Sequence, residues 1–230
     1  MKSQTDQIRH RIRSIEEQVD AGTYRPGPWS ALVREIRTLP GADRRALAAD
    51  VSRASNALHR RAGHPEVSVV TGAALETVAV VASFVPLIGG IDTRSKVLSL
   101  GGALILAAAA QPLLKLIVGT LLGVRYAYAF LFGAEPRFKM RYGSYLARPR
   151  WARVVHHLSG TIGTPLALGF VSSIDAIPPW TRAVCWTLAV VIASANVFCF
   201  LAAAAGWTRL GPLRLSVTSG GSAGRELRGA

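Results

Sequence analysis

Two long stretches of the sequence carry no Asp, Glu, Lys or Arg, and they constrain the fold more than any other feature. They are residues Val154 to Ile174 and Ala183 to Thr208. Uncharged apolar stretches of about 18 residues or more are typical of transmembrane helices. We therefore predict a membrane protein rather than a soluble single domain. A hydrophobic content of 50% also excludes a chain that is disordered throughout.

The apolar regions predict an all-α fold with four transmembrane helices. The membrane domain is expected at residues 66–208, with spans at about 67–91, 97–123, 154–177 and 182–207. The second apolar region stays largely apolar to Phe132, which is too long for one span. It must tilt, kink at Pro112 or extend beyond the bilayer. Two re-entrant halves are the alternative.

The regions before and after the membrane domain are polar. Residues 1–65 predict a cytoplasmic helical region, because apolar residues recur at helical spacing, as in Ile8, Ile12, Ile15 and Val19. A unit of this size is marginal alone, so we expect its apolar faces to dock on a protein partner, on the membrane surface or on each other. Residues 209–230 end in a Gly/Ser-rich segment and predict a flexible basic tail.

Lys and Arg residues alternate in number along the connecting segments, and this predicts the orientation. The first 66 residues contain 12, the first connection has Arg94 and Lys96, the loop 133–153 has six, the next connection has Arg182 alone, and the tail has four. Cytoplasmic segments of membrane proteins are enriched in Lys and Arg. We therefore expect a multi-pass protein of the cell (inner) membrane with both termini and the basic loop 133–153 in the cytoplasm.

Several polar residues lie at matching depth in the predicted spans. At 1.5 Å per residue, Glu76, Lys115, Asn196 and Thr164 are about 12 to 15 Å from the cytoplasmic helix ends. An ionised side chain in a bilayer is costly unless it is paired, so Glu76 and Lys115 suggest each other as partners. A structural ion pair is one interpretation. A proton path or a catalytic site built from Glu76, Lys115, Asn196 and His157 is the other.

The basic loop contains a second candidate site. Arg137, Lys139 and Arg141 alternate with Phe138, Met140 and Tyr142. Cations that bind phosphates beside aromatic rings at the interface favour a lipid headgroup, so we take Arg137, Lys139, Arg141 and Tyr142 as its ligands. Ordinary positive-inside charge with interfacial anchors is the alternative. No nucleic acid is expected as a partner, because no known binding module surrounds this basic segment.

The sequence lacks several common catalytic and nucleotide-binding motifs, and this favours a non-enzymatic function over an enzyme. The sequence has no phosphate-binding loop ending in Gly-Lys-Ser/Thr, no Gly-x-Ser-x-Gly and no paired aspartates. We expect no metal site, and the sequence indicates no cofactor. The leading hypothesis is an accessory, assembly or carrier subunit that engages a protein partner or anionic lipid through its cytoplasmic helices and basic loop. The alternative is a membrane-embedded enzyme acting on a lipid or isoprenoid substrate.

Overall fold

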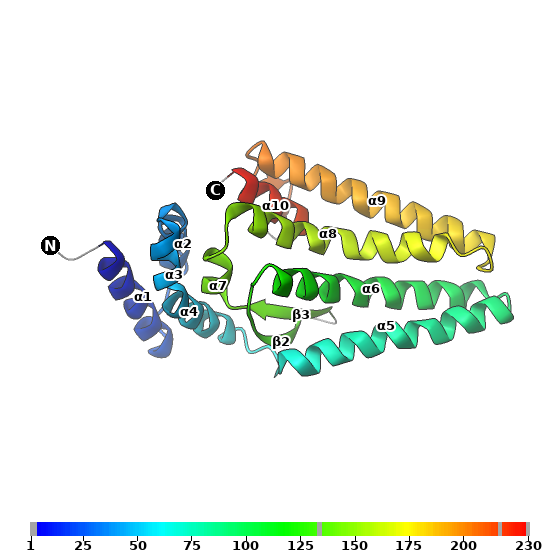
Figure 1. The fold of residues 1–230 in the computed structure, drawn as a ribbon, viewed down its shortest axis with the longest axis horizontal. Coiled ribbons are helices and arrows are strands. Elements are labelled where there is room, and N and C mark those ends of the chain that lie inside the picture. The colour runs from blue at the N-terminus through cyan, green and yellow to red at the C-terminus, as the bar shows by residue number, and fades with distance from the viewer. Residues whose placement is uncertain (1–3, 133–134, 216–217, 229–230) are drawn as a thin grey trace. The chain divides into compact units, whose positions relative to one another are not determined.

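The computed structural model describes residues 4–132, 135–215 and 218–228 (Figure 1). The chain is mostly helical and divides into two compact units. Residues 1–69 and 120–149 form the first, called here the helix–sheet unit, and residues 70–119 and 150–230 form the second, the membrane unit.

Four helices of the chain are long and apolar enough to cross a membrane, consistent with a multi-pass membrane protein. Each is almost free of charged residues over its most apolar window, as predicted. The helices are α5 (Val69–Asp92), α6 (Lys96–Leu121), α8 (Arg150–Ser172) and α9 (Pro179–Ala204).

Within the membrane unit, α5 and α6 approach closely through small residues. A Cβ added at Gly102 of α6 would lie 2.8 Å from the backbone oxygen of Ser83 on α5. Gly90 on α5 would likewise meet the backbone of Ser99 on α6. Small residues at helix interfaces in membranes allow such close backbone contact, which supplies van der Waals packing.

The second apolar region is one helix followed by a strand. Helix α6 continues through Pro112 and ends at Leu121, so the two re-entrant halves are not observed. Gly123 has φ of 76°, a left-handed conformation that glycine adopts without a Cβ clash and that commonly ends helices. The remaining apolar residues Tyr126–Phe132 form strand β2, not an extension of the helix.

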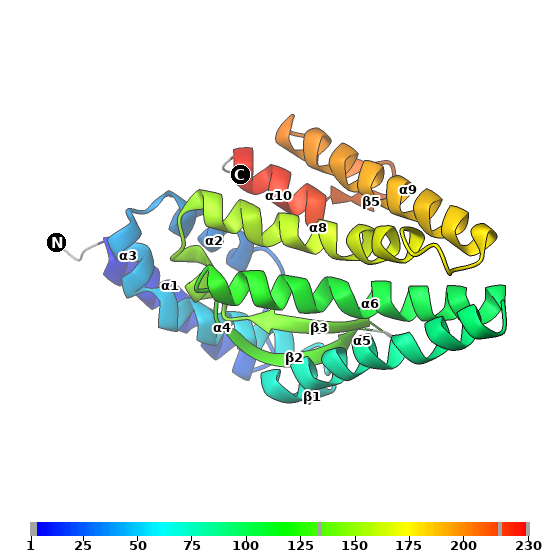
Figure 2. The same cartoon turned by 45° about the vertical axis from the view of Figure 1, so that its right-hand side comes forward.

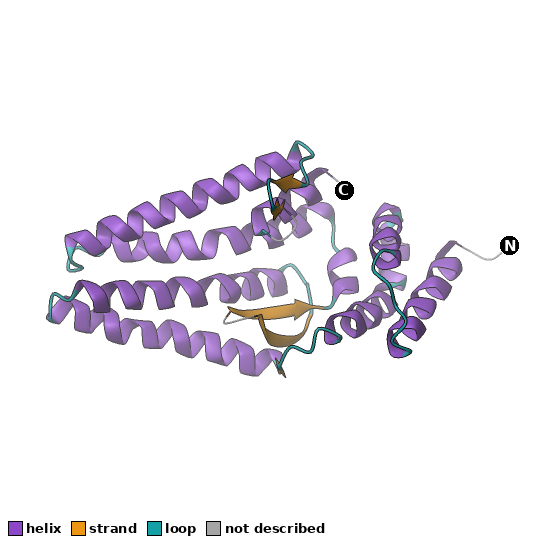
Figure 3. Ribbon diagram, turned by 180° about the vertical axis from the view of Figure 1, so that it is seen from behind, coloured by secondary structure: helices purple, strands orange, loops and turns teal. Residues whose placement is uncertain are grey.

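A three-stranded antiparallel sheet corrects the expectation of helices alone (Figure 3). Strand β2 lies between β1 (Glu66–Val67) and β3 (Glu135–Met140). In the register, Tyr128 pairs with Lys139 and Phe130 with Arg137. The alternating residues of the predicted basic loop therefore point to opposite faces of a strand.

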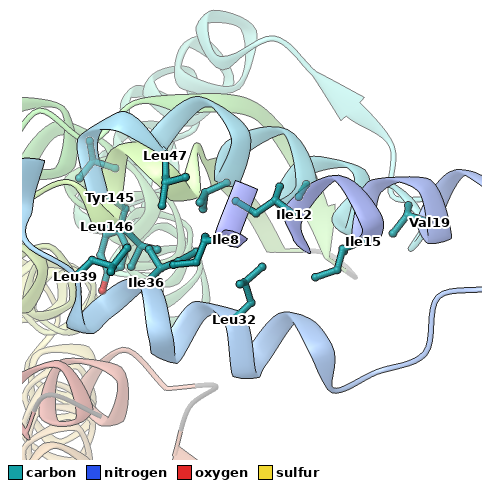
Figure 4. Packing of buried hydrophobic residues seen from close by; sticks show 13 residues of the cluster. Ile8, Ile12, Ile15, Val19, Leu32, Ile36, Leu39, Leu47, Tyr145 and Leu146 are labelled. Atoms are coloured by element: carbon teal, nitrogen blue, oxygen red, sulfur yellow. The ribbon is translucent and has the colours of Figure 1, made fainter. Parts of the chain in front are cut away.

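The apolar faces of the N-terminal helices pack on each other in the helix–sheet unit. Figure 4 shows their side chains meeting in one core with Tyr145 and Leu146. The isoleucines and Val19 predicted as one face are all buried there. Of the three docking modes expected, the structure therefore shows mutual packing. The helices are α1 (Gln4–Asp20), α2 (Pro28–Thr38), α3 (Gly41–Ala46), α4 (Ala48–Arg60) and the short α7 (Tyr142–Leu146).

The C-terminal segment is folded where the sequence suggested a flexible tail. After the short strands β4 (Arg209–Leu210) and β5 (Leu213–Arg214), residues Ser219–Arg228 form helix α10. This helix packs along α8 and α9, as Figures 1 and 2 both show. A Cβ added at Gly220 or at Gly224 would lie 2.3 or 2.2 Å from a backbone oxygen of α9. The small residues that suggested flexibility therefore allow a close helix contact.

Candidate functional site

Lys115, one member of the predicted polar layer, lies where α6, α8 and α10 meet. A Cβ added at Gly160 of α8 would be 3.1 Å from the Lys115 Cδ and 2.8 Å from the Ser219 Oγ at the start of α10. One turn earlier on α8, His156 is 1% exposed and lies within electrostatic reach of Lys115. Lys115 therefore extends toward α8. The partner that the sequence suggested for it, Glu76, lies on α5.

The side chains of Asn196 and Thr164 form hydrogen bonds within the membrane unit. The Asn196 amide donates to the backbone oxygen of Ile192 on its own helix, at 3.0 Å, while the backbone of Asn196 contacts Gly220 of α10. The Thr164 hydroxyl lies 3.0 Å from the Gln111 Oε1 on α6. The Thr164 side chain therefore joins α8 to α6, as polar residues in membrane helices commonly do, whereas the Asn196 side chain bonds within α9.

A buried ion pair fixes α10 to α8. The Arg153 Nε donates to the Glu226 Oε2 at 2.8 Å, and the two side chains are 6% and 3% exposed. The Arg150 Nε also donates to the backbone oxygen of Glu226 at 2.7 Å. The sequence analysis places Arg153 in the basic loop that indicates membrane orientation, and Glu226 in the predicted flexible tail. No sequence signal connects them, because they lie 73 positions apart.

Glu76 is not brought to Lys115. Its side chain is buried on α5, and no ion pair joins it to any residue in the described ranges. The pairing suggested by matching depth is therefore absent from the described part of the chain. His157 is half-buried beside His156, with ring centroids 5.5 Å apart.

Two of the four predicted headgroup ligands, Lys139 and Tyr142, are half-buried and hydrogen-bonded within the helix–sheet unit. The Lys139 Nζ donates to the Ser55 Oγ on α4 at 2.9 Å, and burial lowers the pKa of Lys139 to about 8. The Tyr142 hydroxyl accepts a hydrogen bond from Arg37 at 3.2 Å, and its ring stacks on Tyr145. Both side chains therefore have structural roles in the unit's core.

The strand partner of Lys139 belongs to a buried aromatic group. The Tyr128 hydroxyl lies 2.9 Å from the His59 Nδ1. Burial is the main cause that lowers the pKa of His59, and burial raises the pKa of Tyr128 to about 12. Phe130 packs edge-on to the His59 ring at 4.4 Å between centroids. Burial thus disfavours the charged forms of His59 and Tyr128, which suits a packed interior.

The remaining predicted ligands, Arg137 and Arg141, are exposed, and Arg141 has a neighbour that sequence reasoning missed. The Arg141 backbone N donates to the Arg125 oxygen at 2.7 Å, and the Arg125 backbone N donates to the Ser144 Oγ at 2.9 Å. Arg125 and Arg141 are therefore held side by side through their backbones. Both side chains are exposed, and neither has an ion pair with an acid in the described ranges.

A third arginine completes this group, which we call the arginine cluster: Arg125, Arg141 and Arg148. A Cβ added at Gly123 would lie 2.7 Å from the Arg148 Nη1, so this guanidinium lies at the C-terminal end of α6. A cation is favourable there because of the helix dipole. Arg125 follows the last residue of α6 by four positions, which is at most about 14 Å of extended chain. The cluster is thus close to the end of a membrane helix.

The residues that the structure describes contain no group of three or more His, Cys, Asp or Glu side chains that could hold a metal ion. Cys185 and Cys199 are free and buried on α9. Comparisons with protein-family models, curated proteins and solved structures find no match for this chain.

Proposed function

We propose that this chain is a non-enzymatic subunit of the cell (inner) membrane that engages anionic lipid headgroups through the arginine cluster. The observation that carries the proposal is the pair Arg125 and Arg141, exposed, joined through the backbone and without an acidic partner in the described ranges. Arginine forms strong charge-assisted hydrogen bonds with phosphate oxygens. The lipid surface is favoured over a protein partner, because the apolar faces of the N-terminal helices are buried in their own core.

The charge pattern supports a cytoplasmic location of the cluster. With the helix bounds of the structure, Arg94 is the basic residue between α5 and α6, whereas five lie between α6 and α8. Anionic lipids give the cytoplasmic leaflet a negative surface potential, which attracts Lys and Arg next to a membrane helix. The distribution of Lys and Arg and the attraction to anionic lipid therefore both favour the cytoplasmic side for the arginine cluster.

Cysteine accessibility in intact cells tests this orientation. Thr93→Cys and Ser173→Cys, which follow α5 and α8, should react with a membrane-impermeant maleimide added outside. Ala62→Cys, before α5, should react only after the membrane is permeabilised. The wild-type chain is the control, because its two cysteines are buried on α9. Labelling of Ala62→Cys from outside would refute the cytoplasmic placement.

Lipid binding by the detergent-extracted full chain tests the function. In native mass spectrometry, wild type should retain phosphatidylglycerol in preference to phosphatidylcholine. Each basic residue near an anionic surface contributes about 1 kcal/mol, so Arg125→Ala with Arg141→Ala should weaken phosphatidylglycerol binding by roughly 2 kcal/mol, about 30-fold. Added salt should weaken wild-type binding, because it screens exposed charges.

Arg13→Ala is the matched control for the double variant. Arg13 is exposed on α1 and, like the pair, has no acidic partner in the described ranges, so its loss removes charge away from the cluster. Its variant should bind phosphatidylglycerol as wild type does. Equal binding of both lipids by wild type, or equal losses in the control and the double variant, would contradict a site at the arginine cluster.

A further inference from the structure

A carboxyl group without a partner is buried in the first membrane helix. Glu76 is 3% exposed, and its Oε1 is buried with no hydrogen-bond partner in the described ranges. It lies on the packed side of α5 together with Gly72, Ser83 and Leu87. The valines Val78 and Val81, which are 63% and 64% exposed, lie on the side turned away from the protein. Glu76 is thus enclosed rather than open to lipid.

Glu76 is also far from water along the helix. It is the eighth residue of α5, so it lies roughly 10 Å along the axis from the helix start at 1.5 Å per residue. The other acid on α5 is Asp92, an exposed residue at the opposite end. Solvent therefore reaches Asp92 and does not reach Glu76 in this conformation.

No charged side chain among the described residues forms an ion pair with Glu76. The two cations of α6 are Lys96, at its first residue, and Lys115, which extends toward α8. In the described ranges, no ion pair joins the Glu76 carboxyl group to a basic side chain, and its Oε1 has no hydrogen-bond partner. An isolated ionised carboxylate in such a medium is too costly to persist, and it neutralises instead. A membrane carboxyl group in this position is a candidate for ion or proton handling.

We infer that Glu76 is a proton-binding site in the membrane unit. The carboxylate takes up one proton and is held as the neutral acid in the conformation described here. This inference goes beyond the proposed lipid binding and uses none of its residues, so each stands or falls separately.

Labelling by a hydrophobic carbodiimide tests the inference on the full chain in detergent. Dicyclohexylcarbodiimide adds across the O–H of a protonated carboxylic acid and, away from water, rearranges to a stable N-acylurea with no leaving group. Mass spectrometry should find this adduct on Glu76, declining as the pH of the reaction is raised. Asp92, exposed to water, should remain without it. No adduct on Glu76 at pH 6, or equal adducts on both residues, would overturn the assignment.

Sodium and substitution separate a proton site from its alternatives. Excess Na⁺ at constant pH should leave the labelling of Glu76 unchanged, whereas protection would assign the site to a metal cation instead. Glu76→Gln should abolish the adduct and shift the melting temperature by less than about 4 °C, because it replaces a neutral acid with a neutral amide. A large loss of thermal stability in Glu76→Gln would reveal an ionised Glu76 with a buried counter-charge and refute the inference.

Discussion

Replacement of Glu226 by alanine is expected to destabilise the membrane unit by about 3–5 kcal/mol. The substitution leaves Arg153, whose side chain is 6% exposed, as a buried cation without its carboxylate. Removal of one partner from a buried pair costs far more than the pair itself contributes, because the remaining charge has lost its water. Thermal unfolding of the full chain in detergent should show a lower melting temperature. Release of α10 should also speed tryptic cleavage at Arg225, which lies on that helix.

Two further variants separate this effect from a general loss of charge. Asp175→Ala breaks an ion pair of similar length, 2.9 Å to Arg182, but the Asp175 side chain is 92% exposed, so the cost should be below about 1 kcal/mol. The double variant Arg153→Met with Glu226→Leu removes both buried charges and should recover most of the stability. If Glu226→Ala and Asp175→Ala melted at the same temperature, the buried pair would not be what fixes α10.

The membrane helices could be predicted because hydropathy depends on composition along the chain. An uncharged apolar stretch such as Ala183 to Thr208 has few alternatives to a helix once it lies in lipid, where each backbone group must bond within the segment. The helix bounds moved by a few residues in the structure. The predicted start at 154 became Arg150, because the polar residues before it continue the helix.

The hairpin of β2 and β3 was missed although its signal is in the sequence. Residues Tyr126–Phe132 alternate aromatic and smaller residues, and Arg137–Met140 alternate basic and apolar residues. Such alternation at period two is typical of strands. We interpreted the first segment as part of an apolar span, and the second as a headgroup site. Arg137 and Lys139 lie on the same face of β3, because they are two residues apart. Lys139 is half-buried because it reaches Ser55 on α4, whereas Arg137 is exposed, and the sequence pattern gives no sign of this difference.

Glu76 and Lys115 do not pair because their side chains leave their helices in different directions around the helix axes. Depth along a span follows from residue counting, which predicts similar depths for Glu76 and Lys115. The helix rotation that points Lys115 toward Gly160 depends on packing with α8, which residue counting does not give. The contact of Gly220 and Gly224 with α9 had a signal, since small residues four apart are typical of close helix contacts.

Gly143→Ala should cost about 3 kcal/mol or more in the helix–sheet unit. A Cβ at Gly143 of α7 would lie 1.8 Å from the backbone oxygen of Ala48 on α4, so the two helices must separate. Overpacking of a core commonly costs 1–3 kcal/mol, and a clash with backbone cannot be relieved by a side-chain rotation. The hydrogen bond from the Gly143 backbone N to the Ser52 Oγ, 3.1 Å long, would lengthen as well. Hydrogen exchange of the full chain should become faster in α4 and α7.

The same substitution connects the core of this unit to the proposed lipid site. Helix α7 begins directly after Arg141, and its Ser144 holds the Arg125 backbone. Displacement of α7 should therefore separate the two exposed arginines and weaken phosphatidylglycerol binding, although neither arginine is changed. Gly41→Ala is the control, because its Cβ would meet only flexible arginine side chains at 3.7 and 3.8 Å. If Gly143→Ala matched Gly41→Ala in exchange and in lipid binding, the close contact of α7 with α4 would not position Arg141.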